Sequence, residues 1–284
     1  MRKTILTFCL LHCFIIIFAQ DEKAPPKKSY VKGSLEFVNN SVYLGRTDSI
    51  TTTYLNQSLG YYDKSGFFVS GSASYLAHST ENRFDVFNLD AGYDFSAGNF
   101  NGEIAAEKSF FNSNSTNVKS EVKGNLSFQG TYDFGFIETS LQPGINFGTK
   151  NDYSLVWTVD HNFTVADDAL EITPSFLLNG STRNFYGSYY KNRKLKKKNG
   201  PGVSVSASVL DASEFKVMNY EFTLPLVYTI KKFSIGFTPS YSIAANPAVV
   251  TITTKRASGI IVTQTITEKI QNLFYYSFEA AIKF

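Results

Sequence analysis

The sequence FYYSFEAAIKF, residues 274–284, ends the chain and alternates between apolar and polar positions. One side of an extended segment would carry six of its apolar residues: Phe274, Tyr276, Phe278, Ala280, Ile282 and Phe284. Successive side chains of a strand point to opposite faces, so a period of two predicts a β-strand. An apolar face with aromatic ends, backed by a face that carries Glu279 and Lys283, is typical of a wall between lipid and water.

The same alternation recurs along the chain and predicts twelve strands, an even number, as in bacterial outer-membrane barrels. The predicted segments are 35–44, 53–62, 67–75, 87–95, 100–107, 121–132, 137–147, 153–163, 170–179, 218–228, 233–242 and 274–284. A soluble β-sandwich also hides one face of each strand. Small polar residues on the inner faces, and Phe or Tyr at the ends of the apolar faces, favour a membrane barrel. We therefore predict an all-β fold: a transmembrane antiparallel up-and-down β-barrel.

The first 19 residues have the pattern of a secretory signal peptide. Arg2 and Lys3 precede an apolar stretch that runs to Phe18, and Ala19 offers a small residue for cleavage. That stretch is shorter than the roughly 20 residues that a spanning helix needs. We predict a signal peptide over 1–19, a flexible periplasmic lead-in over 20–33, and the barrel over 34–284.

Both cysteines, Cys9 and Cys13, lie inside this predicted leader. The mature chain would then contain no disulfide, no cysteine nucleophile and no cysteine-based metal site. No later segment is apolar for 18 residues, which excludes spanning helices. The net charge of +3 is too small to indicate a nucleic-acid partner. The sequence shows no glycine-rich phosphate loop and no cluster of metal ligands, so we expect no cofactor.

The connections between predicted strands alternate between short and long. The short ones, which read as tight turns, are 63–65, 96–98, 133–135, 165–168 and 230–232. Two long connections cover 180–214 and 244–271, and the second contains a hairpin pattern over 249–254 and 260–267. If secretion leaves the N-terminus in the periplasm, the short turns are periplasmic and the two long loops extracellular.

Four prolines, Pro143, Pro174, Pro225 and Pro239, fall inside predicted strands. A proline cannot donate a ladder hydrogen bond, so we expect bulges or strand ends at these positions.

The end of the chain resembles the C-terminal strand that the outer-membrane assembly machinery recognises, through Tyr276, Phe278, Ile282 and Phe284. The mature chain as a whole resembles a twelve-stranded bacterial outer-membrane β-barrel. Its Tyr/Asn/Ser-rich strands and the leader ending at Gln20 resemble those of Bacteroidota proteins, without matching a characterised subfamily. The resemblance implies a place in the outer membrane, contact with lipids and lipopolysaccharide, and insertion by the assembly machinery.

Two kinds of outer-membrane barrel are enzymes with recognisable site residues. Outer-membrane phospholipases carry a His and a Ser two residues apart on one strand, but His161 is followed two residues later by Phe163. Omptin-type proteases use Asp pairs and an Asp-His pair at the rim, and the spacing of His78, Asp85 and Asp152 does not favour that site. We therefore expect no enzymatic activity.

Charged residues on the polar face of the predicted strands are mostly acidic. The candidate lumen residues are Asp90, Asp94, Glu103, Glu107, Glu121, Lys123, Glu138, Asp160, Glu171, Glu221 and Glu279. An acidic lumen would favour cations in a small channel for small solutes. Alternatively, these side chains fill the interior, as they do in barrels of about eight strands. The chain would then be a non-conducting scaffold or partner subunit that acts through its extracellular loops.

The first long loop carries a run of basic residues: Lys191, Arg193, Lys194, Lys196, Lys197 and Lys198. Such a run could bind lipopolysaccharide head groups or another anionic solute. The simpler interpretation, which we favour, is a solvated loop tip.

Overall fold

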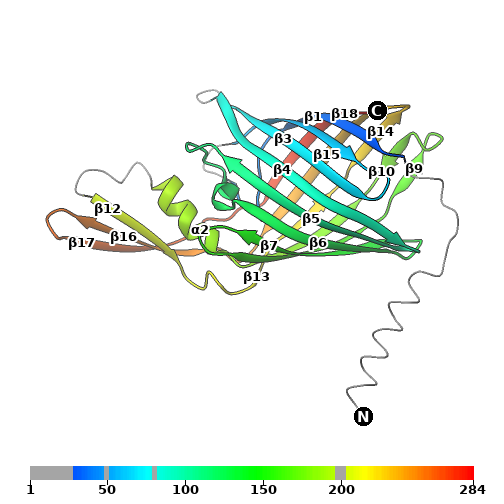
Figure 1. Ribbon diagram of the computed structural model, residues 1–284. Coiled ribbons are helices and arrows are strands. Elements are labelled where there is room, and N and C mark those ends of the chain that lie inside the picture. Colours follow the sequence, from blue (N-terminus) through cyan, green and yellow to red (C-terminus); the bar gives the residue numbers. More distant parts are fainter. Residues whose placement is uncertain (1–27, 48–50, 79–81, 196–202) are drawn as a thin grey trace, which may run out of the picture.

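A computed structural model describes residues 28–47, 51–78, 82–195 and 203–284. Twelve antiparallel strands form the barrel wall (Figure 1). They are β1 (Tyr30–Val38), β2 (Tyr54–Tyr62), β3 (Phe67–Ala77), β4 (Asn82–Ala97), β5 (Phe100–Phe111), β6 (Gly124–Asp133), β7 (Glu138–Phe147), β8 (Asp152–Asp160), β11 (Ser175–Ser181), β13 (Lys216–Thr223), β15 (Phe233–Ala244) and β18 (Leu273–Lys283). The first and last of these close the ring, with Lys32 opposite Lys283 and Val38 opposite Ser277. The predicted barrel class and its strand number are confirmed.

Several predicted boundaries are wrong by a few residues. The first strand begins at Tyr30 and ends at Val38, so its start overlaps the predicted lead-in and its end comes well before residue 44. The sixth strand begins at Gly124, which leaves Glu121 and Lys123 outside it. Alternation continues through flanking residues that pack elsewhere, and it therefore overestimates strand length. The predicted signal peptide, 1–19, lies outside the described residues.

The outer face of the wall is apolar and exposed. Leu59, Leu89, Leu141 and Ile235 all point outward with more than half of their surface accessible. Exposed aromatic side chains lie toward both ends of the strands: Tyr61, Phe67, Tyr93, Tyr132, Phe134, Phe136 and Phe233 toward the short turns, and Phe84, Phe87, Phe110, Phe147, Tyr153, Tyr241 and Phe274 toward the long loops. An apolar band between two aromatic girdles is the outer surface of a barrel in a membrane.

Prolines interrupt the wall on one side. Pro174 separates the short strand β10 (Leu170–Ile172) from β11, and Pro225 separates β13 from β14 (Leu226–Ile230). The neighbouring β8 also stops, and it resumes as β9 (Phe163–Val165). Pairing continues in the same register on both sides of these gaps. The gaps therefore interrupt the ladder of hydrogen bonds without shifting the strands.

The long connections form structure beyond one end of the barrel, here called the loop end. The hairpin predicted in the second connection is present as β16 (Val249–Arg256) and β17 (Ile261–Thr267). A strand that was not predicted, β12 (Val203–Val209), pairs with β16 to complete a three-stranded sheet, which projects away from the barrel (Figure 1). The opposite end, with the short turns and the C-terminus, is the turn end. By the outer-membrane pattern, the turn end is periplasmic and the loop end extracellular.

The first long connection also forms helices, α2 (Asn184–Tyr189) and η2 (Tyr190–Lys194), and a third short helix, η1 (Val118–Glu121), joins β5 to β6. None of the helices in the described part of the chain has the length and apolar character needed to cross a membrane.

Close packing inside the wall gives a first prediction. A β-carbon placed on Gly92 would lie 2.5 Å from the carbonyl oxygen of Ile104 and would overlap the ring of Phe68. Gly92→Ala should therefore cost about 1–3 kcal/mol of folding free energy through overpacking. Urea denaturation of the protein refolded into lipid vesicles measures this change. Gly71→Ala is the matched control, because the nearest atom, Cδ2 of Leu89, lies at an ordinary 3.5 Å. Equal midpoints for the two variants would contradict the prediction.

Candidate functional site: the barrel interior and its cap

Carboxylates occupy many inward-facing positions of the wall. Most of the acidic candidates alternate with the exposed outer residues of their strands, and the strand register agrees, so they lie on the inner face. These half-buried residues are Asp90, Asp94, Glu103, Glu107, Glu138, Asp160, Glu221 and Glu279, with Glu36 beside them. A half-buried side chain on the inner face is in contact with solvent inside the barrel. These residues therefore line a space that is not completely filled by side chains.

Many of these carboxylates face one another directly across neighbouring strands. Glu36 lies opposite Glu279 on β1 and β18, and Glu138 lies opposite Asp160 on β7 and β8. Two further pairs join β4 and β5, namely Asp90 opposite Glu107 and Asp94 opposite Glu103. Like charges that face each other across a strand pair destabilise a sheet. The arrangement therefore costs folding free energy unless protons or cations offset the repulsion.

Basic and amide side chains contact only part of this acidic set. Lys119 Nζ lies 2.7 Å from Oε1 of Glu107, and Lys32 Nζ lies 3.5 Å from Oε1 of Glu279. The amide of Asn56 donates a hydrogen bond of 2.9 Å to Glu36. Lys123, which the alternation predicts to be an inner residue, is exposed just before β6.

Two acidic candidates lie away from the strands of the wall. Glu121 belongs to η1, where its Oε1 pairs with Nε of Arg193 at 2.9 Å. Glu171 is exposed in the short strand β10, on the turn-end side of the proline gap. Period-two alternation cannot separate a strand residue from one in a short helix or a strand extension.

The basic run is partly helical and not simply a loop tip. Lys191, Arg193 and Lys194 belong to η2, and Lys191 is exposed. Arg193 also donates hydrogen bonds from Nη1 to the carbonyl oxygens of Asn112 and Ser113. The prediction of a solvated run is therefore wrong for Arg193, because that side chain joins the first long connection to the β5–β6 segment. Lys196, Lys197 and Lys198 lie outside the described residues.

Burial of inward-facing residues differs sharply between the two ends of the barrel. Toward the turn end, Lys32, Glu103, Gln129, Ser234 and Glu279 remain half-exposed. At the loop end of the strands, the inner residues are buried: Tyr54, Leu76, Asp85, Ser109, Asn146, Asp152, Ser181, Asn219, Ser242 and Leu273. Inner residues are therefore more exposed toward the turn end and are buried at the loop end.

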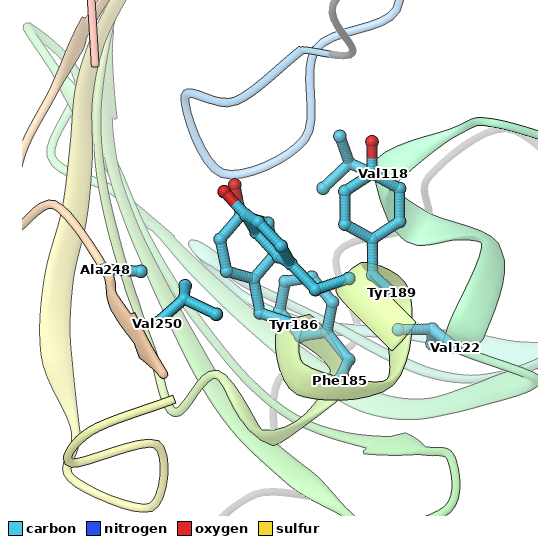
Figure 2. Close-up of a cluster of buried hydrophobic side chains, with 8 residues drawn as sticks. Val118, Val122, Phe185, Tyr186, Tyr189, Ala248 and Val250 are labelled. Carbon is cyan, nitrogen blue, oxygen red and sulfur yellow. The ribbon is translucent and has the colours of Figure 1, made fainter. Parts of the chain in front are cut away.

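A cap made of three segments fills the loop end: residues 39–47, 112–123 and 184–195. Figure 2 shows its apolar centre, in which Phe185, Tyr186 and Tyr189 of α2 lie between Val118 and Val122 on one side and Ala248 and Val250 on the other. The rings of Tyr186 and Tyr189 are stacked with centroids 5.6 Å apart. Burial of aromatic side chains is a strong stabilising contribution, so the cap is a packed structure.

Arg46 fastens the cap to the barrel. It is 4% exposed and donates from Nη1 to the carbonyls of Leu44 and Met218, and from Nη2 to those of Ala245 and Asn246, all within 3.0 Å. Its Nε lies 3.5 Å from Oε2 of Glu268, whose side chain is 8% exposed. One guanidinium group thus joins the β1–β2 loop, the start of β13 and the connection after β15.

Glu268 holds the other side of this contact. Its carboxylate accepts a short hydrogen bond from the hydroxyl of Tyr186 and one of 3.0 Å from the amide of Ala248. The sequence analysis missed both Arg46 and Glu268. Leu44 and Gly45 have positive φ angles of 51° and 72° and form a tight turn. The residues on either side of it, Tyr43 and Arg46, exchange two backbone hydrogen bonds. Gly45 is the residue that could have indicated this turn from the sequence.

Asp85 and Asp152, the rim residues compared above with an omptin-type site, anchor the cap. Asp152 accepts hydrogen bonds from the hydroxyl of Thr182 and from the amides of Asn184 and Phe185, at 2.6–2.8 Å, and so caps the start of α2. Asp85 accepts hydrogen bonds from the hydroxyl groups of Tyr54 and Ser115, at 2.6 and 2.7 Å. Both carboxylates are buried and hold loop segments in place.

The environment of the cap changes the acidity of its polar groups. Burial, and secondarily the neighbouring Glu268, raises the pKa of the Tyr186 phenol above its ordinary value. Burial and the nearby Arg46 lower the pKa of Arg183, whose Nη1 donates to the carbonyl of Asn246. Because the pKa of Tyr186 is raised in the folded state, its contribution to cap stability is complete below about pH 10 and is lost at higher pH.

An outer-membrane phospholipase would need a serine two residues after His161, and Phe163 occupies that position. The His161 ring lies edge-on to the Phe163 ring, with centroids 4.4 Å apart. Within the described ranges, no three His, Cys, Asp or Glu side chains are grouped so that they could hold a metal ion.

Comparisons with known proteins give structural similarity only. No protein-family profile and no curated protein sequence matches the chain. The KdgM porin is 11% identical, with 90% of this chain and 99% of the porin covered and a TM-score of 0.45. An outer-membrane channel from Pseudomonas putida F1 is 8% identical, with 93% and 100% covered and a TM-score of 0.46. The NanC porin is 8% identical, with 90% and 98% covered and a TM-score of 0.45.

The fold itself locates the chain. The wall is closed, its outer face is an exposed apolar band with aromatic girdles, and its inner face is polar. Only a closed barrel satisfies the backbone hydrogen bonds of strands within a bilayer. The protein is therefore an outer-membrane protein.

Arg46→Ala should loosen the cap while the wall stays intact. Removal of one partner of a buried ion pair costs about 3–5 kcal/mol, because the other charge is left buried and uncompensated. Hydrogen–deuterium exchange should therefore rise in residues 39–47 and 184–195 and remain slow in β3–β5. Lys216→Ala is the control, since its partners Asp211 and Glu214 are exposed and such pairs contribute about 0–1 kcal/mol. Unchanged exchange in the Arg46 variant would show that the cap does not depend on this contact.

Proposed function

We propose that the protein is a small outer-membrane channel for small solutes, with an acidic interior that favours cations. In the described conformation, its extracellular side is closed by the cap. A solute would reach the interior from the periplasmic side, and passage would require the cap to move.

The carboxylate pairs across the strands are the observation that carries this proposal. They place acidic groups opposite each other on β1 and β18, on β4 and β5, and on β7 and β8, which are well separated around the ring. A lumen lined by carboxylates concentrates cations by charge. Bound or passing cations would also offset the repulsion between the facing pairs, so the same residues favour both cation entry and a stable wall.

Polar contacts join the cap segments to one another around the apolar centre. Arg46, Glu268 and Tyr186 connect three segments that are far apart in the sequence. Loss of Arg46 would remove the contacts that join residues 39–47 to the start of β13 and to the connection after β15. The cap is therefore suited to act as the part that opens, whereas the wall is held by strand pairing around the closed ring.

A non-conducting scaffold or partner subunit is the alternative. The projecting sheet favours it, because the tip of the β16–β17 hairpin exposes Ile260, Ile261 and Val262 to the outside. Exposed apolar residues at the end of an extracellular hairpin could contact another protein. Under either function, we expect lipids and lipopolysaccharide to surround the barrel. We also expect the assembly machinery to recognise Tyr276, Phe278, Ile282 and Phe284.

Single-channel recording in a planar bilayer tests the channel. We expect rare or small openings for the wild type, and longer openings for Arg46→Ala because its cap is loosened. Under a salt gradient the reversal potential should show cation preference, and Glu103→Gln with Glu138→Gln should move that potential toward zero.

The matched control is Asp167→Asn with Asp168→Asn, which removes the same number of charges from the exposed turn between β9 and β10. It should leave the selectivity unchanged. An absence of current in repeated insertions of both the wild type and Arg46→Ala would overturn the channel and favour the scaffold. Equal effects of the two charge-removing variants would overturn the assignment of selectivity to the inner carboxylates.

A further inference from the structure

A groove on the outside of the barrel follows the line of proline gaps. Its volume is about 530 Å³, and nearly all of its lining is apolar. Pro174, Leu224 and Pro239 lie along the groove, and Phe176, Phe222 and Phe274 contribute aromatic rings to its lining. Phe222 and Phe274 are at least half exposed on the lipid-facing side. The short proline rings between tall aromatic side chains explain why the surface is hollowed here.

The backbone beneath the groove is held by fewer hydrogen bonds than the rest of the wall. His161, Thr173 and Leu224 donate their amides to the carbonyls of Pro174, Pro225 and Pro239, at 3.4, 3.0 and 3.1 Å. Residues that face each other in this way normally exchange two hydrogen bonds. Proline has no N–H group, so none of the three pairs has the second bond. The three weakened pairs lie side by side, because β8, β11, β13 and β15 are consecutive in the wall.

We propose that this groove binds one phospholipid of the periplasmic leaflet, with an acyl chain along the row of prolines. The position of the groove determines the ligand class, because only hydrocarbon surrounds the outward face of a barrel in a membrane. An unfilled hollow would forfeit dispersion contacts along its lining, which a chain in the groove restores. The aromatic walls have few rotatable bonds and present a preformed shape to that chain.

The orientation follows from the two ends of the groove. One end lies at His161, Asp160 and Ile137, beside the turn between β6 and β7 at the periplasmic side of the wall. His161 is a polar outward-facing residue at this end, which suits a head group. The other end reaches Tyr241 and Phe274, at the loop-end portions of β15 and β18. A chain that enters at His161 thus runs from the periplasmic side of the wall toward the aromatic girdle at the loop end.

Native mass spectrometry of the detergent-purified protein tests the proposal. The wild type should retain one phospholipid per barrel. Val159→Phe with Leu224→Phe should abolish retention, because both residues line the groove and larger side chains would fill it. The matched control is Val69→Phe with Leu141→Phe, which enlarges two outward residues that are about half exposed and lie outside the groove. This control should retain the lipid.

Fluorescence supplies a second measurement on the same variants. Trp157 is the only tryptophan of the chain, and its ring lies 6.2 Å from the ring of Phe176 in the groove wall. Addition of a phospholipid with brominated chains, in detergent, should quench it and saturate near one equivalent. The groove variant should lose the saturable phase and the control variant should keep it.

Several outcomes would overturn the proposal. These are a lipid distribution without a preferred stoichiometry, equal retention by both double variants, or quenching that rises linearly without saturation. A retained lipopolysaccharide or free fatty acid would contradict the assigned source. Heat-modifiable gel mobility establishes that each variant has folded, so that a lost lipid reports on the groove. The channel measurements are independent of these results.

Discussion

The structure depends on one constraint: each peptide group inside a bilayer must be hydrogen-bonded within the protein. The sheet meets this constraint by pairing its first strand, β1, with its last, β18. Closure separates an outer face that must be apolar from an inner face that can be polar. The period of two along each strand is the expression of that separation in the sequence. The aromatic girdles, the inner carboxylates and the cap all take their positions from the closed ring.

Prolines weaken this ring locally without breaking it. Pro174, Pro225 and Pro239 remove donors from adjacent strand pairs, but the register is the same on both sides of the gap. The wall tolerates the loss because each pair retains one hydrogen bond and the neighbouring residues stay paired. Two of these prolines, Pro174 and Pro239, also line the groove on the lipid-facing surface, where their rings are shorter than the neighbouring aromatic side chains. A single feature of the sequence therefore affects both the hydrogen bonding and the outer shape of the wall.

The two ends of the barrel are stabilised in different ways. At the turn end, short connections such as the one that contains Gly66 or Gly98, both at positive φ, close each hairpin locally. At the loop end, segments from three distant parts of the chain pack around α2, and Arg46 joins them through backbone carbonyls. Buried polar contacts of this kind are costly to disrupt. The inner residues are consequently more exposed toward the turn end than at the loop end.

The sequence by itself determined the fold class, the strand number, the inner and outer faces and the hairpin of residues 249–267, because all of these follow from local alternation and turn residues. It could not determine the cap. Arg46 and Glu268 are more than 200 residues apart, and no spacing rule relates a guanidinium group to a distant carboxylate. The facing carboxylates, such as Glu138 and Asp160, were recognisable singly as inner residues. Their pairing required the strand register, which is a property of the folded sheet. The groove likewise depends on strand pairing, which brings Pro174, Leu224 and Pro239 from three separate strands into one row.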